Sequence, residues 1–251
     1  MSEAYDPDNL LDSRTPRSTM ELQYEHMRER ERELLDRHLR LRGGDVLSVG
    51  CGWNPGRHAF PAPGWRMTGV ELDDEKPKAL VADGVLDEGL AGRAGELPFE
   101  PSSFDVVLYR LVLHHIAFQG PLTPVFEEAA RLLRPGGALV AVEPGALHPV
   151  GMGLAAANAL GLGRAVHGTP DDIPLSPARL VAEAGTAGLV PRLHTVTYTW
   201  RRMPPALQRA LWPLDRGLGS RPRAAPFGHT LLLIARRESV QTGPELLDHS
   251  A

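Results

Sequence analysis

The chain has 251 residues, 42% of them hydrophobic, and a formal net charge of -4 at pH 7. This length supports one full core with some elaboration. A single cysteine excludes an internal disulfide framework and a zinc site built from cysteines alone. The mildly acidic balance provides no basic footprint for nucleic acid, and the polar, acidic N-terminus is not typical of a signal peptide. We therefore expect a cytoplasmic protein that does not bind nucleic acid.

The first predicted element is a highly charged helix. Residues 1–18 have the composition of a loose leader. Residues 19–41 contain no glycine or proline and place acidic and basic side chains three or four positions apart. This pattern predicts one long helix with a solvated face. A basic arm for nucleic acid fits less well, because glutamate and arginine alternate and their charges cancel.

Short β-branched segments then alternate with helical ones. The predicted strands are 45–50, 66–72, 88–94, 104–110, 137–144, 193–200 and 228–237, and the predicted helices after the first are 124–133 and 176–188. This rhythm is typical of a parallel sheet with helical crossovers. The longest weakly polar run, 150–163, is broken by glycine and shorter than the ~20 residues of a spanning helix. We therefore expect no membrane span.

The turn after the first predicted strand contains two glycines, in the stretch DVLSVGCGWNPG (45–56). In an open parallel sheet the ligand crevice lies beyond the carboxyl ends of the strands, and Gly50 and Gly52 would let the backbone approach a ligand closely. Glu71 ends the next strand, where an acid can bind both hydroxyls of a ribose. These features predict a ribose-bearing cofactor. Pro55 stands where a dinucleotide site needs its third glycine, which disfavours NAD relative to S-adenosylmethionine.

Two further stretches carry a family resemblance. ELPFEPSSFDVVLYRLVLHHI (96–116) and FEEAARLLRPGGALVAVEPG (126–145) resemble the class I S-adenosylmethionine-dependent methyltransferases. The resemblance implies a Rossmann-like α/β fold, with a seven-stranded, mostly parallel sheet and an antiparallel last strand. It also implies a division of the chain. The parts are a methyltransferase domain over 19–237 with an N-terminal helix at 19–41, a cofactor-binding core at 45–145, substrate-side inserts at 146–175 and 201–227, and a tail at 238–251.

The resemblance assigns the first part of a cofactor site. Gly50, Cys51 and Gly52 match the family's glycine turn beside the methionine part of S-adenosylmethionine. Glu71 matches the acid that holds the ribose, and Leu72 would lie against the adenine. Cys51 has no paired base beside it in the sequence, so we interpret it as a small buried residue rather than a nucleophile.

The second part of the assigned cofactor site follows the third and fourth strands. Ala94 matches the position whose backbone amide meets the adenine ring, and Tyr109 and Arg110 begin the segment that passes under the sulfonium. Arg93 stands where the family has an aspartate for the adenine amino group. A guanidinium cannot accept a hydrogen bond from that group, although it can stack on the ring.

His114 and His115 follow the fourth strand, at the rim where a substrate would sit. Histidine is suited to removing a proton from a nucleophile at neutral pH. Such a pair can also be a local structural feature. As the catalytic base we expect one of the two, with His115 preferred over His114.

A second cluster of titratable residues lies in the later insert. His167, Asp171 and Asp172, with Glu143 at the end of the fifth strand, could hold a divalent cation. A proline-bounded surface turn explains the same residues more simply. We therefore predict no metal site.

The sequence predicts an S-adenosylmethionine-dependent methyltransferase that acts on a small-molecule acceptor, with O-methylation preferred. A lipid or quinone C-methyltransferase is the nearest alternative. A non-catalytic S-adenosylmethionine-binding protein is an alternative of a different class, because Ser48, Asn54 and Arg93 depart from the family pattern. The oligomeric state is left open.

Overall fold

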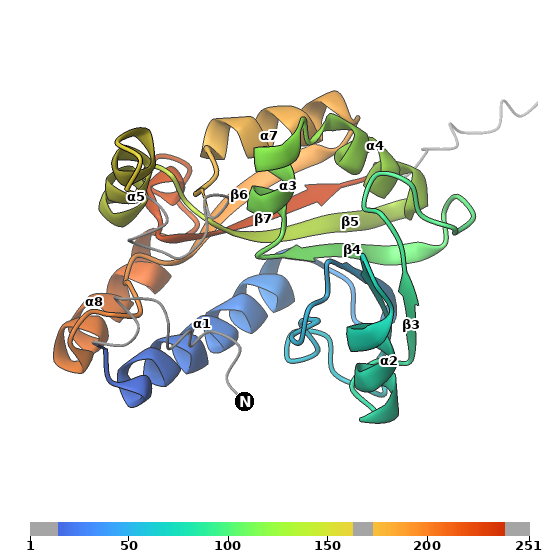
Figure 1. Ribbon diagram of the computed structural model, residues 1–251, viewed down its shortest axis with the longest axis horizontal. Helices are drawn as coiled ribbons and strands as arrows, with labels where there is room; N and C mark the ends of the chain where they lie inside the picture. The colour runs from blue at the N-terminus through green and yellow to red at the C-terminus, as the bar shows by residue number, and fades with distance from the viewer. Residues whose placement is uncertain (1–14, 163–172, 239–251) are drawn as a thin grey trace, which may run out of the picture.

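A computed structural model describes residues 15–162 and 173–238, and its elements surround one seven-stranded sheet (Figure 1). The strands are β1 (Gly44–Val49), β2 (Trp65–Glu71), β3 (Glu88–Ala91), β4 (Phe104–Arg110), β5 (Leu133–Pro144), β6 (Val190–Thr197) and β7 (Thr230–Arg236). The helices are α1 (Arg17–His38), α2 (Glu75–Ala82), α3 (Leu113–Gln119), α4 (Thr123–Leu132), α5 (Pro149–Ala159), α7 (Pro177–Thr186), α8 (Pro205–Leu218) and the 3-10 turn η1 (Ala225–Phe227). His167, Asp171 and Asp172 lie outside the described residues.

The sheet has the predicted topology. Its strand order is β3-β2-β1-β4-β5-β7-β6, and β7 runs antiparallel to both β5 and β6. The four central strand pairs from β3 to β5 are parallel. The predicted seven-stranded, mostly parallel sheet with an antiparallel last strand is therefore confirmed.

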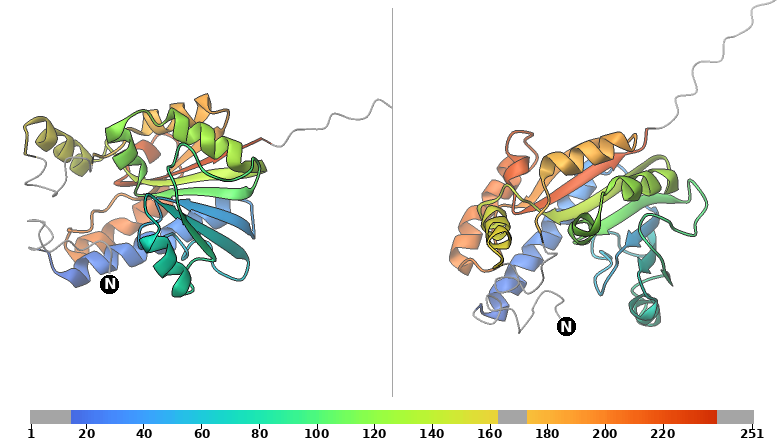
Figure 2. Two further views of the ribbon diagram at one scale, coloured as in Figure 1. Left: turned by 45° about the vertical axis from the view of Figure 1, so that its right-hand side comes forward. Right: turned by 45° about the horizontal axis from the view of Figure 1, so that its top comes forward.

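Helices cover both faces of the sheet, which explains why its strands are almost continuously apolar (Figures 1 and 2). On one face, α4 and α7 bury Phe126, Leu132 and Leu180 against the strands. On the other face, α1 and α2 contribute Leu34 and Leu80 to a second cluster. Helices α5 and α8 both lie toward one end of the molecule, at the left of Figure 1.

The chain reverses its direction of travel across the sheet at β1. It runs outward from β1 to β2 and β3, and then returns to place β4 on the other side of β1. Connections leave neighbouring strands in opposite directions at such a switch point, so we expect the ligand crevice beyond the carboxyl ends of the strands. Gly50 follows β1 there and Leu111 follows β4, which places the two predicted site segments side by side.

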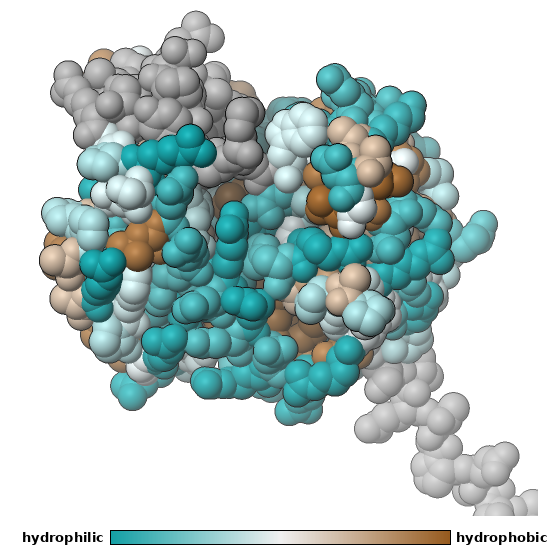
Figure 3. Space-filling model, turned by 90° about the horizontal axis from the view of Figure 1, so that it is seen from below, coloured by the Kyte–Doolittle hydropathy of each residue, from teal (hydrophilic) through white to brown (hydrophobic). Residues whose placement is uncertain are grey.

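Helix α1 differs from its prediction on one face. Its outer residues are exposed, and the surface seen from below is mainly hydrophilic (Figure 3). The inner face, however, buries Arg30 and Glu31, which are 3% and 1% exposed. Arg30 donates to the carbonyl of Asp215, 185 residues away, as well as pairing with Glu33 of its own helix, and Glu31 pairs with Arg110, 79 residues away. The interpretation of the charges as a solvated face is wrong for these two residues, because spacing within the helix does not show pairing outside it.

Within residues 15–162 and 173–238, none of the helices combines the length and the apolar character that a membrane span requires.

Two histidines on the last strands are buried in a way that opposes protonation. His229, which precedes β7, packs edge-on against His148, and burial together with that neighbour lowers its pKa to about 3. His194, on β6, is 5% exposed and stacks on His38, and burial lowers its pKa to about 4. The folded protein therefore holds both rings neutral in a pH range where an unfolded chain protonates them.

We predict that acidification destabilises the fold. The folded state binds fewer protons than the unfolded state below the ordinary histidine pKa near 6.5, so stability is complete above that pH and falls as the pH decreases. For each ring, the free energy of unfolding should be about 2 kcal/mol lower at pH 5 than at pH 7. Urea titrations at pH 7 and 5 test this, with His194→Asn as the control: equal losses in the variant and the wild type would contradict the prediction.

Candidate active site

The turn after β1 uses its two glycines for different purposes. Gly50 and Gly52 both have left-handed backbones, with φ of +65° and +48°. A Cβ atom added to Gly50 would lie 2.3 Å from Cγ2 of Val112, whereas one added to Gly52 would meet nothing within 4 Å. Gly50 therefore permits close packing between the segments that follow β1 and β4, and Gly52 borders open space on which a ligand can lie.

Cys51 lies beneath the turn and faces the sheet. It is 3% exposed and belongs to the core cluster on the α1 side. Its Sγ atom would be 3.1 Å from a Cβ added to Gly69 of β2. The backbone N–H groups of Gly50 and Cys51 both donate to the carbonyl of Val70, at 2.8 and 3.1 Å. This environment is that of a packing residue, as interpreted from the sequence.

Glu71 points toward the glycine turn from the end of β2. Its Oε2 accepts a hydrogen bond from Gly52 N at 3.0 Å, and its Oε1 accepts one from Leu72 N at 3.0 Å. Each carboxylate oxygen has a further lone pair, so Glu71 can hold the turn and still accept hydrogen bonds from hydroxyls. Leu72 is 71% exposed beside it and offers an apolar surface. These residues fit a ribose with an attached base.

Two more predicted cofactor residues lie beyond β3, at the same edge of the sheet. Arg93 is exposed and forms an isolated antiparallel bridge with Glu96. Ala94 is partly buried and packs on the core cluster beneath. The candidate cofactor site therefore follows the carboxyl ends of β1, β2 and β3 in turn.

The side chains of Tyr109 and Arg110 point away from the crevice. Tyr109 is fully buried, its hydroxyl donates to the carbonyl of Val125 at 3.3 Å, and burial raises its pKa. The Arg110 side chain is 7% exposed and pairs with Glu31 of α1. Leu111, which follows, is 38% exposed and has a φ of +56°. Any role of the Tyr109–Arg110 segment toward a cofactor is therefore carried by its backbone.

A buried carboxylate orients one of the two predicted histidines. Glu143, at the end of β5, is fully buried and lies 2.6 Å through Oε2 from Nδ1 of His114. Its Oε1 accepts hydrogen bonds from the N–H groups of Val112 and Leu113, at 2.9 and 2.8 Å. Glu143 therefore fixes both the first turn of α3 and the ring of His114.

His115 occupies a different environment. It is partly exposed, and its ring contacts that of His114 at a centroid distance of 4.0 Å and an angle of 41°. The sequence preferred His115, whereas it is His114 that contacts Glu143. Sequence reasoning considered Glu143 only as a cation ligand. The pairing of Glu143 with His114 is not visible in the sequence, because the two residues are 29 positions apart. The position of Glu143 at the end of a strand that borders the crevice is the one sequence feature that points to it.

No group of three or more histidine, cysteine or acidic side chains suited to a metal ion occurs among the described residues. The alternative cation site suggested by the sequence includes His167, Asp171 and Asp172, which lie outside them. The oxygens of Glu143 are engaged by His114 and by the α3 backbone.

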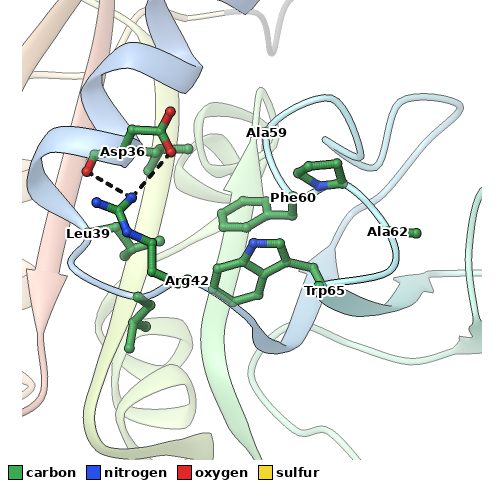
Figure 4. A pocket seen from close by; sticks show the side chains of 11 residues that line it. Asp36, Leu39, Arg42, Ala59, Phe60, Ala62 and Trp65 are labelled. Carbon is green, nitrogen blue, oxygen red and sulfur yellow. Dashed lines mark hydrogen bonds and ion pairs between the residues drawn. The ribbon is translucent and has the colours of Figure 1, made fainter.

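A separate pocket lies at the opposite edge of the sheet (Figure 4). It has a volume of about 320 Å³ and is bordered by the end of α1 and the residues before β2. Phe60 and Trp65 pack edge to face at 5.1 Å, and Asp36 pairs with Arg42 at 3.6 Å on its rim. Both charged residues are largely exposed. This pocket is remote from the crevice because Trp65 begins β2, whereas Glu71 ends it.

Known proteins share both the core sequence and the fold. Residues 47–141 match the family described as "Methyltransferase domain". The chain is 38% identical over 111 residues to 27-O-demethylrifamycin SV methyltransferase of Amycolatopsis mediterranei, covering 40% of this chain and 39% of that protein. It is 33% identical over 112 residues to the ubiquinone biosynthesis O-methyltransferase of Nitrosospira multiformis, covering 41% and 44%. The matches thus span about two-fifths of these relatives.

Solved structures resemble a larger part of the chain. A protein of Thermotoga maritima described as a possible histamine N-methyltransferase aligns with a TM-score of 0.61 at 15% identity, over 88% of this chain and 92% of that one. Geranyl diphosphate C-methyltransferase of Streptomyces coelicolor, solved with S-adenosyl-L-homocysteine, aligns with a TM-score of 0.57 at 17% identity, over 92% and 87%. Residues 47–141 are thus similar in sequence to a methyltransferase domain, and the fold of the chain is similar to that of these solved structures.

We predict different outcomes for alanine at the two glycines. Gly50→Ala should lower the thermal midpoint, because its methyl group overlaps Val112 and its backbone is left-handed. Gly52→Ala meets no protein atom, so it should cost only the backbone strain, about 1 kcal/mol, and mainly weaken cofactor binding. Thermal melts and S-adenosylmethionine titrations of both variants test this. Normal binding by Gly52→Ala would place the cofactor elsewhere.

Proposed function

We propose that the protein binds S-adenosylmethionine at the ends of β1, β2 and β3 and methylates a small-molecule acceptor, preferably on oxygen. The cofactor supplies an electrophilic methyl group when bound. The protein's residues hold the two reactants in line and exclude water, which provides most of the rate enhancement in such displacements. The observation that carries this proposal is the His114–Glu143 pair beside the glycine turn.

The hydrogen-bond geometry of the pair supports one arrangement of its protons. Nδ1 of His114 faces a carboxylate, so the hydrogen is placed on Nδ1 and Nε2 becomes the proton acceptor. The negative charge of Glu143 also stabilises the imidazolium that forms when Nε2 removes a proton. This arrangement suits a hydroxyl acceptor, which must lose a proton as its oxygen is methylated.

Helix α5 suggests what kind of acceptor the crevice receives. It begins six residues after Glu143, and Gly151 is the only one of its residues that is buried. Its sequence from Pro149 to Ala159 carries no charge, and Met152 is 53% exposed. We propose that the acceptor has an apolar body that covers this surface.

The relatives support oxygen as the acceptor atom, since the two named above are an O-methyltransferase and a methyltransferase of a 27-O-demethyl compound. The apolar surface of α5 also suits the alternative acceptor, a lipid or quinone that is methylated on carbon, and a structural neighbour is a C-methyltransferase. The histidine pair distinguishes the O- and C-methylation proposals from a non-catalytic binder, because simple cofactor storage needs no oriented base.

We predict that His114, not His115, controls turnover. His114→Ala should lower the rate of methyl transfer by roughly 10²–10⁴, the usual range for a general base, with little change in cofactor affinity. His115→Ala, which removes the neighbouring ring but not the carboxylate contact, should retain most activity. Glu143→Gln should lower turnover and alter the acid side of the pH–rate profile. Homocysteine-nucleoside release with a panel of hydroxylated apolar acceptors measures these rates. Equal losses in both histidine variants would refute the assignment of the base.

We also predict that α5 contributes to binding of the acceptor and not to binding of the cofactor. Met152→Gln should raise the acceptor KM about fivefold by removing an apolar contact, and leave the dissociation constant of S-adenosylmethionine unchanged. Val190→Gln is the matched control, because Val190 is 42% exposed at the amino end of β6, away from the crevice. The idea fails if both variants show the wild-type KM toward every apolar acceptor that is turned over.

A further inference from the structure

We infer that Glu31 of α1 is a positioning residue for the cofactor crevice, an inference that rests on the proposed function. It joins the connection after β1 to the segment after β4. These are the two segments that meet at the switch point of the sheet.

The contacts of Glu31 reach two separate parts of the chain. Oε1 accepts a hydrogen bond from Nη2 of Arg110 and Oε2 accepts one from Nε, both at 3.1 Å. Oε2 also lies 2.9 Å from Nε2 of His58. Arg110 is the last residue of β4, and His58 follows the glycine turn by six positions. One carboxylate on α1 therefore holds both walls of the crevice from below.

The packing around these contacts leaves little freedom between the two walls. A Cβ added to Gly56 would lie 2.6 Å from Leu108 Cδ2 and 3.8 Å from Arg110 Cδ, so the turn rests directly on β4. On the crevice side, a Cβ added to Gly50 would lie 2.3 Å from Cγ2 of Val112. A movement of Arg110 would thus shift the turn as well as its own strand.

The backbone next to Arg110 explains why an anchor is needed there. Leu111 has a φ of +56°, which is costly for a branched side chain and persists only when neighbouring contacts impose it. Glu31 fixes Arg110 on one side of Leu111, and Glu143 fixes Val112 on the other. Loss of either anchor allows Leu111 to relax, which would displace His114 three residues further on.

Glu31 has the charge state that this role requires. Burial alone would raise its pKa, but Arg110 and His58 outweigh burial and lower the pKa to about 2. The residue is therefore ionised throughout the neutral range, and its bidentate pairing with a guanidinium is directional.

Glu33 provides a matched control on the same helix. It pairs with Arg30 of its own helix and with Arg216 of α8, at 2.8 Å for the latter. Its partners belong to α1 and α8 rather than to the crevice walls. Glu31→Gln and Glu33→Gln thus remove the same charge from positions two residues apart.

The test uses the full-length protein and two measurements. Hydrogen–deuterium exchange of the unliganded protein reports the order of residues 50–60 and 110–116. Calorimetric titration reports S-adenosylmethionine affinity. Glu31→Gln should speed exchange in both segments and weaken binding about tenfold, the scale of lost charge-assisted hydrogen bonds. Glu33→Gln should leave both segments unchanged and bind within about twofold of the wild type.

A double variant separates positioning from stability. Glu31→Leu combined with Arg110→Leu removes both buried charges, so the fold can recover its thermal midpoint. If exchange stays fast and binding stays weak in it, positioning is supported. Wild-type exchange and affinity in either Glu31 variant would overturn the inference. Failure of the wild type to bind S-adenosylmethionine would instead reject the proposed function, while the exchange comparison would still decide whether Glu31 orders the two walls.

Discussion

The carboxylate of Glu143 is the constraint on which the candidate active site depends. It is fully buried, and a buried charge is tolerated only when donors replace its water. Three groups do so, all from the segment after β4: the N–H groups of Val112 and Leu113 and the ring of His114. Since β5 neighbours β4 in the sheet, the same interaction sets where α3 begins and where the histidine points. Site geometry here is thus a consequence of sheet topology.

A second carboxylate acts on the same segment from the opposite face. Glu31 binds Arg110 from the α1 side, whereas Glu143 binds Val112 from the β5 side. Between them lies Leu111, with its left-handed backbone and 38% exposure. Strained backbone conformations persist where flanking contacts determine them fully. The two carboxylates together therefore explain how a leucine can border the crevice in a conformation that usually needs glycine.

Much of this could be predicted from the sequence, and the rest could not for identifiable reasons. Strand positions follow from β-branched runs, and Gly50, Gly52 and Glu71 from their places at strand ends. The Tyr109 side chain points into the core because of the face of β4 on which it lies. A continuous apolar run does not show which residues lie on which face of a strand. The choice between His114 and His115 required Glu143, and the burial of Glu31 required Arg110. Both partners are distant in sequence and are brought close only by the sheet.

The connection between β1 and β2 shows why α1 became part of the site. Parallel strands are usually joined by a helix that covers the sheet, and Pro61 and Pro63 predict that any such helix is short. The described residues 51–64 contain turns and no helix. The sheet face is left for α1, whose Leu34 and Leu35, with Leu39 just after the helix, join Met67 and Val106 in one cluster. A helix that fills this layer must also meet the polar groups beneath the crevice, so Glu31 replaces the solvent that Arg110 and His58 would otherwise need. The N-terminal helix and the cofactor turn are consequently expected to lose order together.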